Sequence, residues 1–255
     1  MISAAWRSSE DSAALIAFLG TGYLLWVRRE RVSLSGGGNW LSVSMLMLAM
    51  LCYVTGSVQE IRLLQQIGAV LVVCCTFCCL TAANSLWAIL PIGLTLLFSI
   101  EVPSLARDAI SQPLAVANAH IVGEILGAVG VENEVLGTLV SAGQIELQVV
   151  DACDGLRLFW SVLLLTYIMC VAGSVKLRTA LLMILVAPAL ALLANTLRIL
   201  VVALAYQELL PDEAARIHDV SGGLMMSGAW LLPFALFRIW PKKHNQQAAS
   251  IKQLM

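Results

Sequence analysis

The sequence predicts an all-α polytopic membrane protein with about seven (six to eight) transmembrane helices and one outer-face amphipathic or re-entrant helix. Of the 255 residues, 60% are hydrophobic and 12% are charged, which excludes a soluble enzyme. The mean hydropathy is +0.87. Each crossing of a bilayer core needs roughly 20 residues, so seven helices take roughly 140 and leave about 115 for loops and ends. The net charge of −1 gives no basic excess that would suggest a nucleic acid partner.

Seven apolar segments bounded by charged residues are the candidate spans, at residues 12–27, 40–56, 67–83, 85–100, 156–173, 179–200 and 223–240. Glu10 and Asp11 precede the first segment and a basic cluster follows it, which is the reverse of a signal peptide. We therefore expect this segment to stay in the mature chain. One integral domain over residues 1–255 is predicted, with a polar tail at 241–255 in the cytoplasm.

The basic residues predict the topology, because cytoplasmic loops carry an excess of Lys and Arg. With the N-terminus outside, the inner side receives nine of the fifteen: Arg28, Arg29, Arg31, Lys176, Arg178, Arg238, Lys242, Lys243 and Lys252. Every acidic residue except Glu30 falls at or beyond the outer face. The sequence thus predicts an inner-membrane protein with its N-terminus out and its C-terminus in.

Residues 101–154 contain nine acidic or basic side chains and do not fit a span. Their apolar residues have helical spacing, at Leu114, Ile121, Ile125, Leu126 and Val129. This pattern predicts an amphipathic helix on or in the outer leaflet. A short β-like segment follows at residues 145–150.

Three polar segments lie at the predicted outer ends of three helices, at residues 151–157, 195–199 and 216–223. Ionisable groups at membrane depth are costly and therefore mark candidate functional sites. The three segments bring a thiol, a guanidinium and an imidazole to the same face. Together, Cys153, Arg198 and His218 form the set that a nucleophilic site requires.

The residue types suggest a role for each group. Cys153 attacks as a thiolate, which a nearby cation or the start of a helix stabilises, and Gly155 lets the backbone bend there. His218 protonates a leaving amine, and either Asp219 or Asp154 holds its ring. Arg198 stays charged, so it stabilises an oxyanion or binds a carboxylate. Asn195, one turn earlier, orients Arg198 or donates to the substrate.

The other cysteines and histidines are expected to be bystanders. Cys52 and Cys170 are small apolar fillers. Four cysteines lie inside an apolar span without His or acidic partners, so we expect no metal site and no cofactor: Cys74, Cys75, Cys78 and Cys79. His120 and His244 are expected to be solvated.

The three polar segments resemble motifs of the exosortase and archaeosortase family of membrane transpeptidases. That family has an Ala-Cys-Ser-Gly-Leu-like motif, an Asn-x-x-Arg-Ile-like motif and a His followed by a Gly. The counterparts here are residues 152–156, 195–199 and 218–222, and the resemblance covers roughly residues 85–240, the expected catalytic core.

The resemblance implies a protease or transpeptidase for exported proteins that carry a tripartite C-terminal sorting signal, such as a Pro-Glu-Pro motif, a hydrophobic helix and a basic end. It implies a thioester on Cys153, acid–base work by His218 and oxyanion stabilisation by Arg198, with an unknown acceptor. Asp154 departs from the small residue usual after the cysteine. A carboxylate there disfavours a thiolate unless it pairs with Arg157 or Arg198.

Two alternatives remain from the residues alone. In a transporter or export component, Asp151, Arg198 and His218 would line a polar path, although such a path places charges at the middle of spans and these cluster at one boundary. In an inactive assembly subunit, the outer amphipathic helix would bind a partner.

Overall fold

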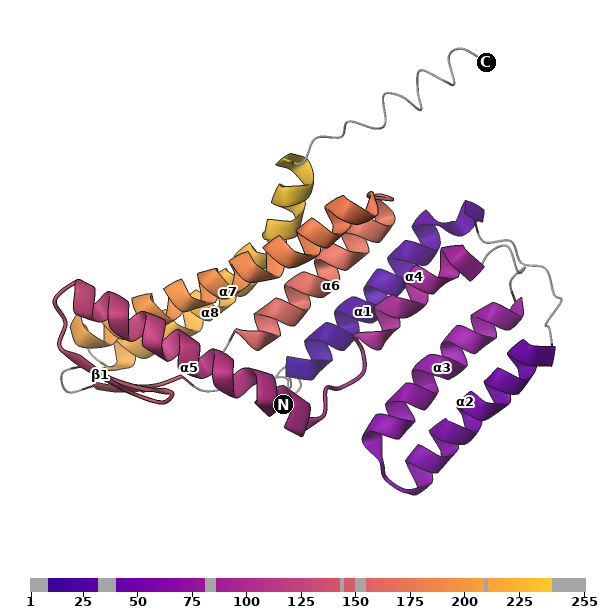
Figure 1. Cartoon of the computed structure of the whole chain (residues 1–255), viewed down its shortest axis with the longest axis horizontal. Helices are drawn as coiled ribbons and strands as arrows, with labels where there is room; N and C mark the ends of the chain where they lie inside the picture. The colour runs from indigo at the N-terminus through magenta and orange to yellow at the C-terminus, as the bar shows by residue number, and fades with distance from the viewer. Residues whose placement is uncertain are drawn as a thin grey trace, which may run out of the picture.

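The computed structural model describes residues 9–31, 40–80, 86–142, 145–149, 155–208 and 211–239. This part of the chain is mostly helical (Figure 1). Three of its helices are long and apolar enough to cross a membrane, at Arg62–Leu80, Leu177–Tyr206 and Arg216–Arg238. Shorter apolar helices lie at Ala14–Val27, Ser42–Val58 and Leu156–Ala172. The polytopic helical architecture is thereby supported, while the count of seven spans stays a prediction.

The first half of the chain forms four helices, α1 (Ser9–Val27), α2 (Trp40–Val58), α3 (Arg62–Leu80) and α4 (Leu86–Leu97). A short 3₁₀ turn, η2 (Arg29–Arg31), follows α1. The first two helices match the predicted spans closely. In contrast, α4 is only 12 residues long and contains Pro91, and α3 begins five residues before the predicted start.

Helices α2 and α3 form a hairpin that lies beside the rest of the bundle (Figure 1). Two glycines allow their backbones to touch. A Cβ atom on Gly56 would lie 2.4 Å from the Gln65 backbone nitrogen, and one on Gly68 would lie 2.5 Å from that of Tyr53. The hairpin contacts the segment that follows α4, because Gln66 Oε1 accepts a hydrogen bond from the Glu101 backbone N–H at 2.9 Å.

The second half contains α6 (Leu156–Ala172), α7 (Leu177–Glu208) and α8 (Pro211–Ile239). They share a core of small and branched side chains, Leu158, Val162, Ala187, Ala191 and Ala229. A second core joins α6 to α1 and α4, through Ala17, Leu24, Ile92, Leu164 and Ile168. The two cores make α6 the central helix of the bundle.

Helices α7 and α8 are longer than predicted, with 32 and 29 residues. At 1.5 Å per residue, α7 is about 48 Å long, which exceeds the roughly 30 Å of a bilayer core. The predicted end at residue 200 was wrong because no Gly or Pro follows there to stop the helix. Likewise, residues 216–223 are not a segment before the last span, since they lie inside α8.

The region predicted as an amphipathic helix contains α5 (Ser104–Ala128), followed by β1 (Asn133–Leu136), β2 (Leu139–Ala142) and β3 (Ile145–Gln148). The strands form an antiparallel sheet in the order β1-β2-β3. The β-like segment expected at 145–150 corresponds to β3. The all-α prediction missed the other two strands, whose two-residue turn has Gly137 at φ +63°.

The predicted apolar face of α5 is largely exposed. Ile121, Ile125 and Val129 are 44%, 38% and 63% exposed. The buried stripe consists mainly of smaller residues, Ala115, Ala119, Val122 and Leu126, and it packs with Val140, Ala142 and Val149 of the sheet region and with Ile199 and Ala203 of α7. Small side chains decide the buried face because they let α5 approach its neighbours closely.

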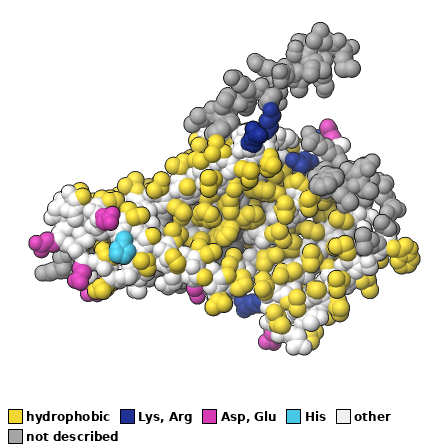
Figure 2. All heavy atoms as spheres, viewed as in Figure 1, with side chains coloured by type: hydrophobic (Ala, Val, Ile, Leu, Met, Phe, Trp, Pro, Cys, Tyr) yellow, Lys and Arg dark blue, Asp and Glu magenta, His cyan; other side chains and the backbone are white. Residues whose placement is uncertain are grey.

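Basic residues gather at one end of the bundle. Arg28 Nη2 donates a 2.7 Å hydrogen bond to the Val171 carbonyl, so the ends of α1 and α6 lie together. Lys176 and Arg178 lie where α7 begins, and Arg238 lies in the last turn of α8. A broad apolar surface separates this end from the acidic side chains near α5 and the sheet (Figures 1 and 2).

A buried hydrogen bond joins α5 to α7. The Thr196 hydroxyl lies 2.7 Å from Asn118 Oδ1 and 3.1 Å from the Leu192 carbonyl. Both Asn118 and Thr196 are buried. This bond fixes α5 at the level of residues 195–198.

We expect Thr196→Val to lower the free energy of unfolding by about 1–3 kcal/mol, because it removes a partner from a buried amide. Thr76→Val is the matched control, since the exposed Thr76 hydroxyl bonds only to the carbonyl four residues earlier among the described contacts. It should change stability by less than about 0.5 kcal/mol. Thermal unfolding in detergent measures both, and equal effects would contradict the role of the bond.

Candidate functional site

Arg198 of α7 contacts α8 through three hydrogen bonds. Its Nη2 lies 3.4 Å from His218 Nε2 and donates to the His218 carbonyl at 3.2 Å, and its Nε donates to Ser221 Oγ at 3.4 Å. A guanidinium only donates hydrogen bonds. His218 Nε2 therefore presents a lone pair to Arg198.

The other ring nitrogen of His218 faces Asp219. Nδ1 lies 3.3 Å from Asp219 Oδ1, and the aspartate is exposed. With Nε2 as the acceptor, the neutral ring carries its proton on Nδ1, where it donates to the carboxylate. Arg198 and Asp219 together select one tautomer of His218.

Because Gly222 has no side chain, the guanidinium of Arg198 can lie directly against α8. A Cβ atom on Gly222 would lie 2.9 Å from Arg198 Nη2 and 3.3 Å from Cζ. Ser221, beside it, donates to the His218 carbonyl at 3.0 Å and accepts from Arg198. The charged group is thus held by side-chain and backbone groups of one helical turn.

A second close approach joins the start of α6 to α7. Gly155 precedes α6 with φ +83°, and a Cβ atom there would lie 2.9 Å from Asn195 Nδ2. Asn195 is buried and lies one turn before Arg198. The chain enters α6 beside the stretch of α7 that carries both polar residues.

The three polar segments predicted to converge are brought together where the structure describes them. Gly155 meets Asn195, and Arg198 meets His218 with Asp219 beside it. Arg157 is exposed on the first turn of α6. Cys153, Asp154 and Asp151 lie outside the described residues.

Two contacts of the site were missed from the sequence. Ser221 and Gly222 were part of a predicted motif, but neither was expected to hold Arg198. The signal lay in their spacing, because residues 218, 221 and 222 share one face of a helix. Treating the segment as a loop concealed that shared face.

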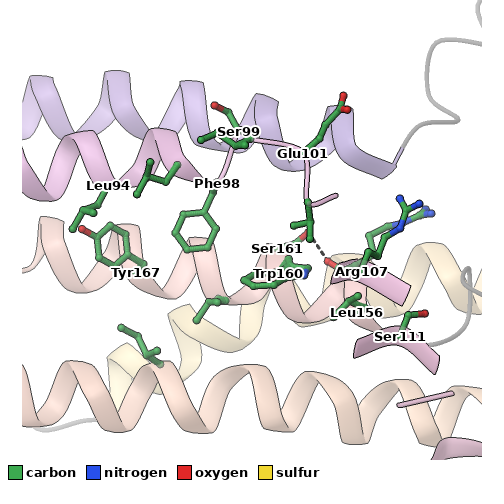
Figure 3. A pocket seen from close by; sticks show the side chains of 16 residues that line it. Leu94, Phe98, Ser99, Glu101, Arg107, Ser111, Leu156, Trp160, Ser161 and Tyr167 are labelled. Atoms are coloured by element: carbon green, nitrogen blue, oxygen red, sulfur yellow. Dashed lines mark hydrogen bonds between the residues drawn. The ribbon is translucent and has the colours of Figure 1, made fainter. Parts of the chain in front are cut away.

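A cavity of about 760 Å³ opens beside the start of α6 (Figure 3). It lies between α4, the α4–α5 connection, the first turns of α5, and α6. Its charged lining residues are Glu101, Arg107 and Arg157. Its aromatic lining residues are Phe98, Trp160 and Tyr167.

The described ranges hold no group of three His, Cys, Asp or Glu side chains placed to bind a metal. His120 lies exposed on α5, and His244 is outside the described residues. Helix α3 carries the thiols of Cys74, Cys75, Cys78 and Cys79. These thiols are remote in sequence from Arg198 and His218.

We expect Gly155→Ala to destabilise the protein more than Gly130→Ala. Both glycines have left-handed backbones, with φ +83° and +87°, so each variant incurs about 1–2 kcal/mol of strain. Only at Gly155 does the new Cβ meet Asn195, since Gly130 has nothing within 4 Å. The melting temperatures in detergent test this, and equal shifts would show that the contact with Asn195 is loose.

The comparisons with known proteins gave one family match. The family model described as Transmembrane exosortase (Exosortase_EpsH) matches residues 5–235, nearly the whole chain. No curated protein and no solved structure matches.

Proposed function

The chain belongs to the transmembrane exosortase family, and from that premise we propose that it is a cysteine-dependent sorting protease or transpeptidase. Its substrates are exported proteins with a tripartite C-terminal sorting signal, cleaved at the outer face of the cytoplasmic membrane. Cys153 is the nucleophile and forms an acyl-enzyme thioester. No cofactor takes part in the proposed reaction.

One observation carries this proposal: a permanent cation and a tautomer-selected histidine lie 3.4 Å apart beside the start of α6. The chain reaches that point two residues after Cys153, at Gly155, which packs against Asn195 of the same α7. Nucleophile, acid–base and oxyanion groups must share one small space for acyl transfer. These contacts support such a space.

The proposed reaction begins when the Nε2 lone pair of His218 turns from Arg198 to the thiol of Cys153 and takes its proton. The thiolate attacks the carbonyl carbon of the scissile peptide, and Arg198 stabilises the resulting oxyanion. As the intermediate collapses, the C–N bond breaks and His218 protonates the leaving amine. A water molecule or an acceptor amine then attacks the thioester and releases the thiolate, and His218 removes a proton from the attacking group.

The surroundings of Arg198 suit this role because they fix its position before the reaction. Ser221, Gly222 and the His218 carbonyl hold the guanidinium, so little reorganisation is needed when charge develops. Asp219 keeps the Nδ1 proton in place and stabilises the imidazolium that forms. Asn195 is a positioning residue between the start of α6 and Arg198.

The proposed orientation places the basic end of the bundle in the cytoplasm. Arg28, Arg29, Lys176, Arg178 and Arg238 then follow the positive-inside rule. The end with α5, the sheet and Arg198 faces outward, where exported substrates arrive. A transporter would instead need polar groups distributed across the spans, whereas Arg198 and His218 contact each other at one level.

Replacement of Cys153 by Ala is expected to abolish processing of a co-expressed reporter that carries the C-terminal sorting signal, because no acyl-enzyme forms. The variant should insert in the membrane at the normal level. Immunoblots of reporter size and of the enzyme measure both. Processing at the normal rate in the Cys153→Ala cells would refute the proposed nucleophile.

Gly222→Ala is expected to lower processing at least tenfold, because its Cβ displaces the guanidinium of Arg198 and such donors contribute about 10²-fold or more. Gly223→Ala is the control. It adds the same methyl group to the next position of α8, where nothing lies within 4 Å. Both variants gain helix propensity, so a similar loss in both would exclude the contact with Arg198 as the cause.

A further inference from the structure

We propose that an apolar groove between α1, α6 and α8 binds an anionic phospholipid, with an acyl chain in the groove and the headgroup beside Arg29 and Arg238. The groove has a volume of about 630 Å³ and lies towards the basic end of the bundle. This inference goes beyond the proposed reaction, because the groove is at the end away from Arg198. It does not depend on the identity of the nucleophile.

Helix α6 forms the floor of the groove. In Figure 1, α6 lies between α1 and α8, and both pack on it. Two glycines of the lining allow these close approaches. A Cβ atom on Gly20 of α1 would overlap Ile168 Cδ1, and one on Gly173, at the end of α6, would lie 2.5 Å from Phe237 Cζ of α8. Helices α1 and α8 have few contacts with each other, so the space between them stays open.

The lining of the groove suits a hydrocarbon chain. It includes aliphatic side chains such as Leu19 and Leu165 and the ring of Phe234. Leu19 and Phe234 are 66% and 51% exposed, so the walls are accessible from outside the protein. An acyl chain packs against such walls by dispersion contacts and leaves no polar group without a partner.

The length of the groove is close to one leaflet of a bilayer. Its lining runs from Ile16 to Tyr23 on α1 and from Leu165 to Gly173 on α6. At 1.5 Å per residue these stretches are about 11 and 12 Å long. One leaflet contributes about 15 Å of hydrocarbon, half of the roughly 30 Å core. This length favours a lipid tail over a membrane-spanning helix, which would extend about twice as far.

Arg238 lies at the α8 side of the groove. It follows the lining residue Phe234 by four positions, so the two side chains share a face of α8. Side chains of a helix lean towards its N-terminus, which directs Arg238 back towards the groove. Arg238 is exposed, and the ion pairs within the described ranges do not include it. Its guanidinium is therefore available to an external anion.

Arg29 lies at the α1 side of the groove. Trp26 follows the lining residue Leu19 by two helical turns and continues the same edge of the groove. The Arg29 guanidinium carbon lies 5.4 Å from the centroid of the Trp26 ring. A guanidinium that lies over a ring keeps its N–H groups as donors at its edge. The indole itself suits the headgroup level of a membrane.

The charges at this end of the bundle favour an anionic lipid. Glu30 is the one acidic side chain that the described residues place there, against the exposed Arg29 and Arg238. A phosphate accepts charge-assisted hydrogen bonds from guanidinium groups. Tyr23, a lining residue that is 50% exposed, adds a hydroxyl donor. Phosphatidylcholine carries its own cation beside the phosphate, so it gains less from the arginines than phosphatidylglycerol does.

Photo-cross-linking of the whole protein in phosphatidylcholine nanodiscs tests the proposal. Two trace probes, a phosphatidylglycerol and a phosphatidylcholine, carry the same diazirine-bearing acyl chain. Mass spectrometry compares cross-links in the groove, at residues 16–23, 165–173 and 234–237, with those at residues 43–54, an exposed apolar stretch of α2. At about fivefold for each arginine, we expect a roughly 20-fold preference for phosphatidylglycerol in the groove and none on α2.

Matched variants assign the recognition to residues. Arg238→Gln and Arg29→Gln should each lower the preference about fivefold. Arg178→Gln should keep it, because Arg178 is exposed at the same end but belongs to α7, which is not part of the lining. Phe234→Ala should lower the yield of both probes in the groove by the same factor. Phe18→Ala is its control, since Phe18 is 60% exposed on α1 and does not line the groove.

An equal ratio of the two probes in the groove and on α2 would overturn the proposal, because the arginines would then serve the topology alone. Weak cross-linking of both probes in the groove, relative to α2, would assign the groove to a polypeptide and overturn the proposal as well. The Cys153→Ala protein should show the parent's preference, so the lipid site and the proposed nucleophile are tested separately.

Discussion

The contact of the Arg198 guanidinium with α8 is the interaction on which the described site depends. It requires Gly222, because a side chain there would occupy the space of the guanidinium. It also selects the tautomer of His218, because Nε2 accepts a hydrogen bond from Arg198 while Nδ1 faces Asp219. A cation is costly at membrane depth unless polar groups surround it. Here α8 supplies a hydroxyl, a carbonyl and a ring nitrogen within one turn, so the helix pair and the polar site stabilise each other.

Helix α5 and the sheet strengthen this arrangement. Because α7 is longer than a bilayer core, its last turns offer a surface to which α5 and the sheet add a core around Val122, Leu126 and Val140. The bond from Thr196 to Asn118 lies in the same turn of α7 as Asn195. Asn195 in turn packs against Gly155. One stretch of α7 thus fixes α5 on one side and the start of α6 on the other.

Much of this architecture could be predicted from the sequence, and the failures have physical causes. Hydrophobicity located α1 and α2 well, and the rarity of charge drew attention to Arg198 and His218. The length of a membrane span does not predict where a helix ends beyond the bilayer, so the predicted lengths of α7 and α8 were too short. Large apolar residues such as Ile121 and Ile125 lie on the exposed apolar face of α5, whereas mainly smaller residues mark where α5 approaches its neighbours closely. Ser221 and Gly222 share a helical face with His218, and this face was missed because the segment was placed before the last span instead of inside a helix.

The depth of Arg198 along α7 has a consequence for the fate of the proposed thioester. Arg198 lies 21 residues after Leu177, so about 32 Å of helix separates it from the start of α7, close to a full hydrocarbon thickness. A site at that boundary would be reached by water. The proposed acyl-enzyme would then partition between hydrolysis and transfer according to how much acceptor amine is present beside it. The supply of acceptor would thus control whether a released or an attached product accumulates.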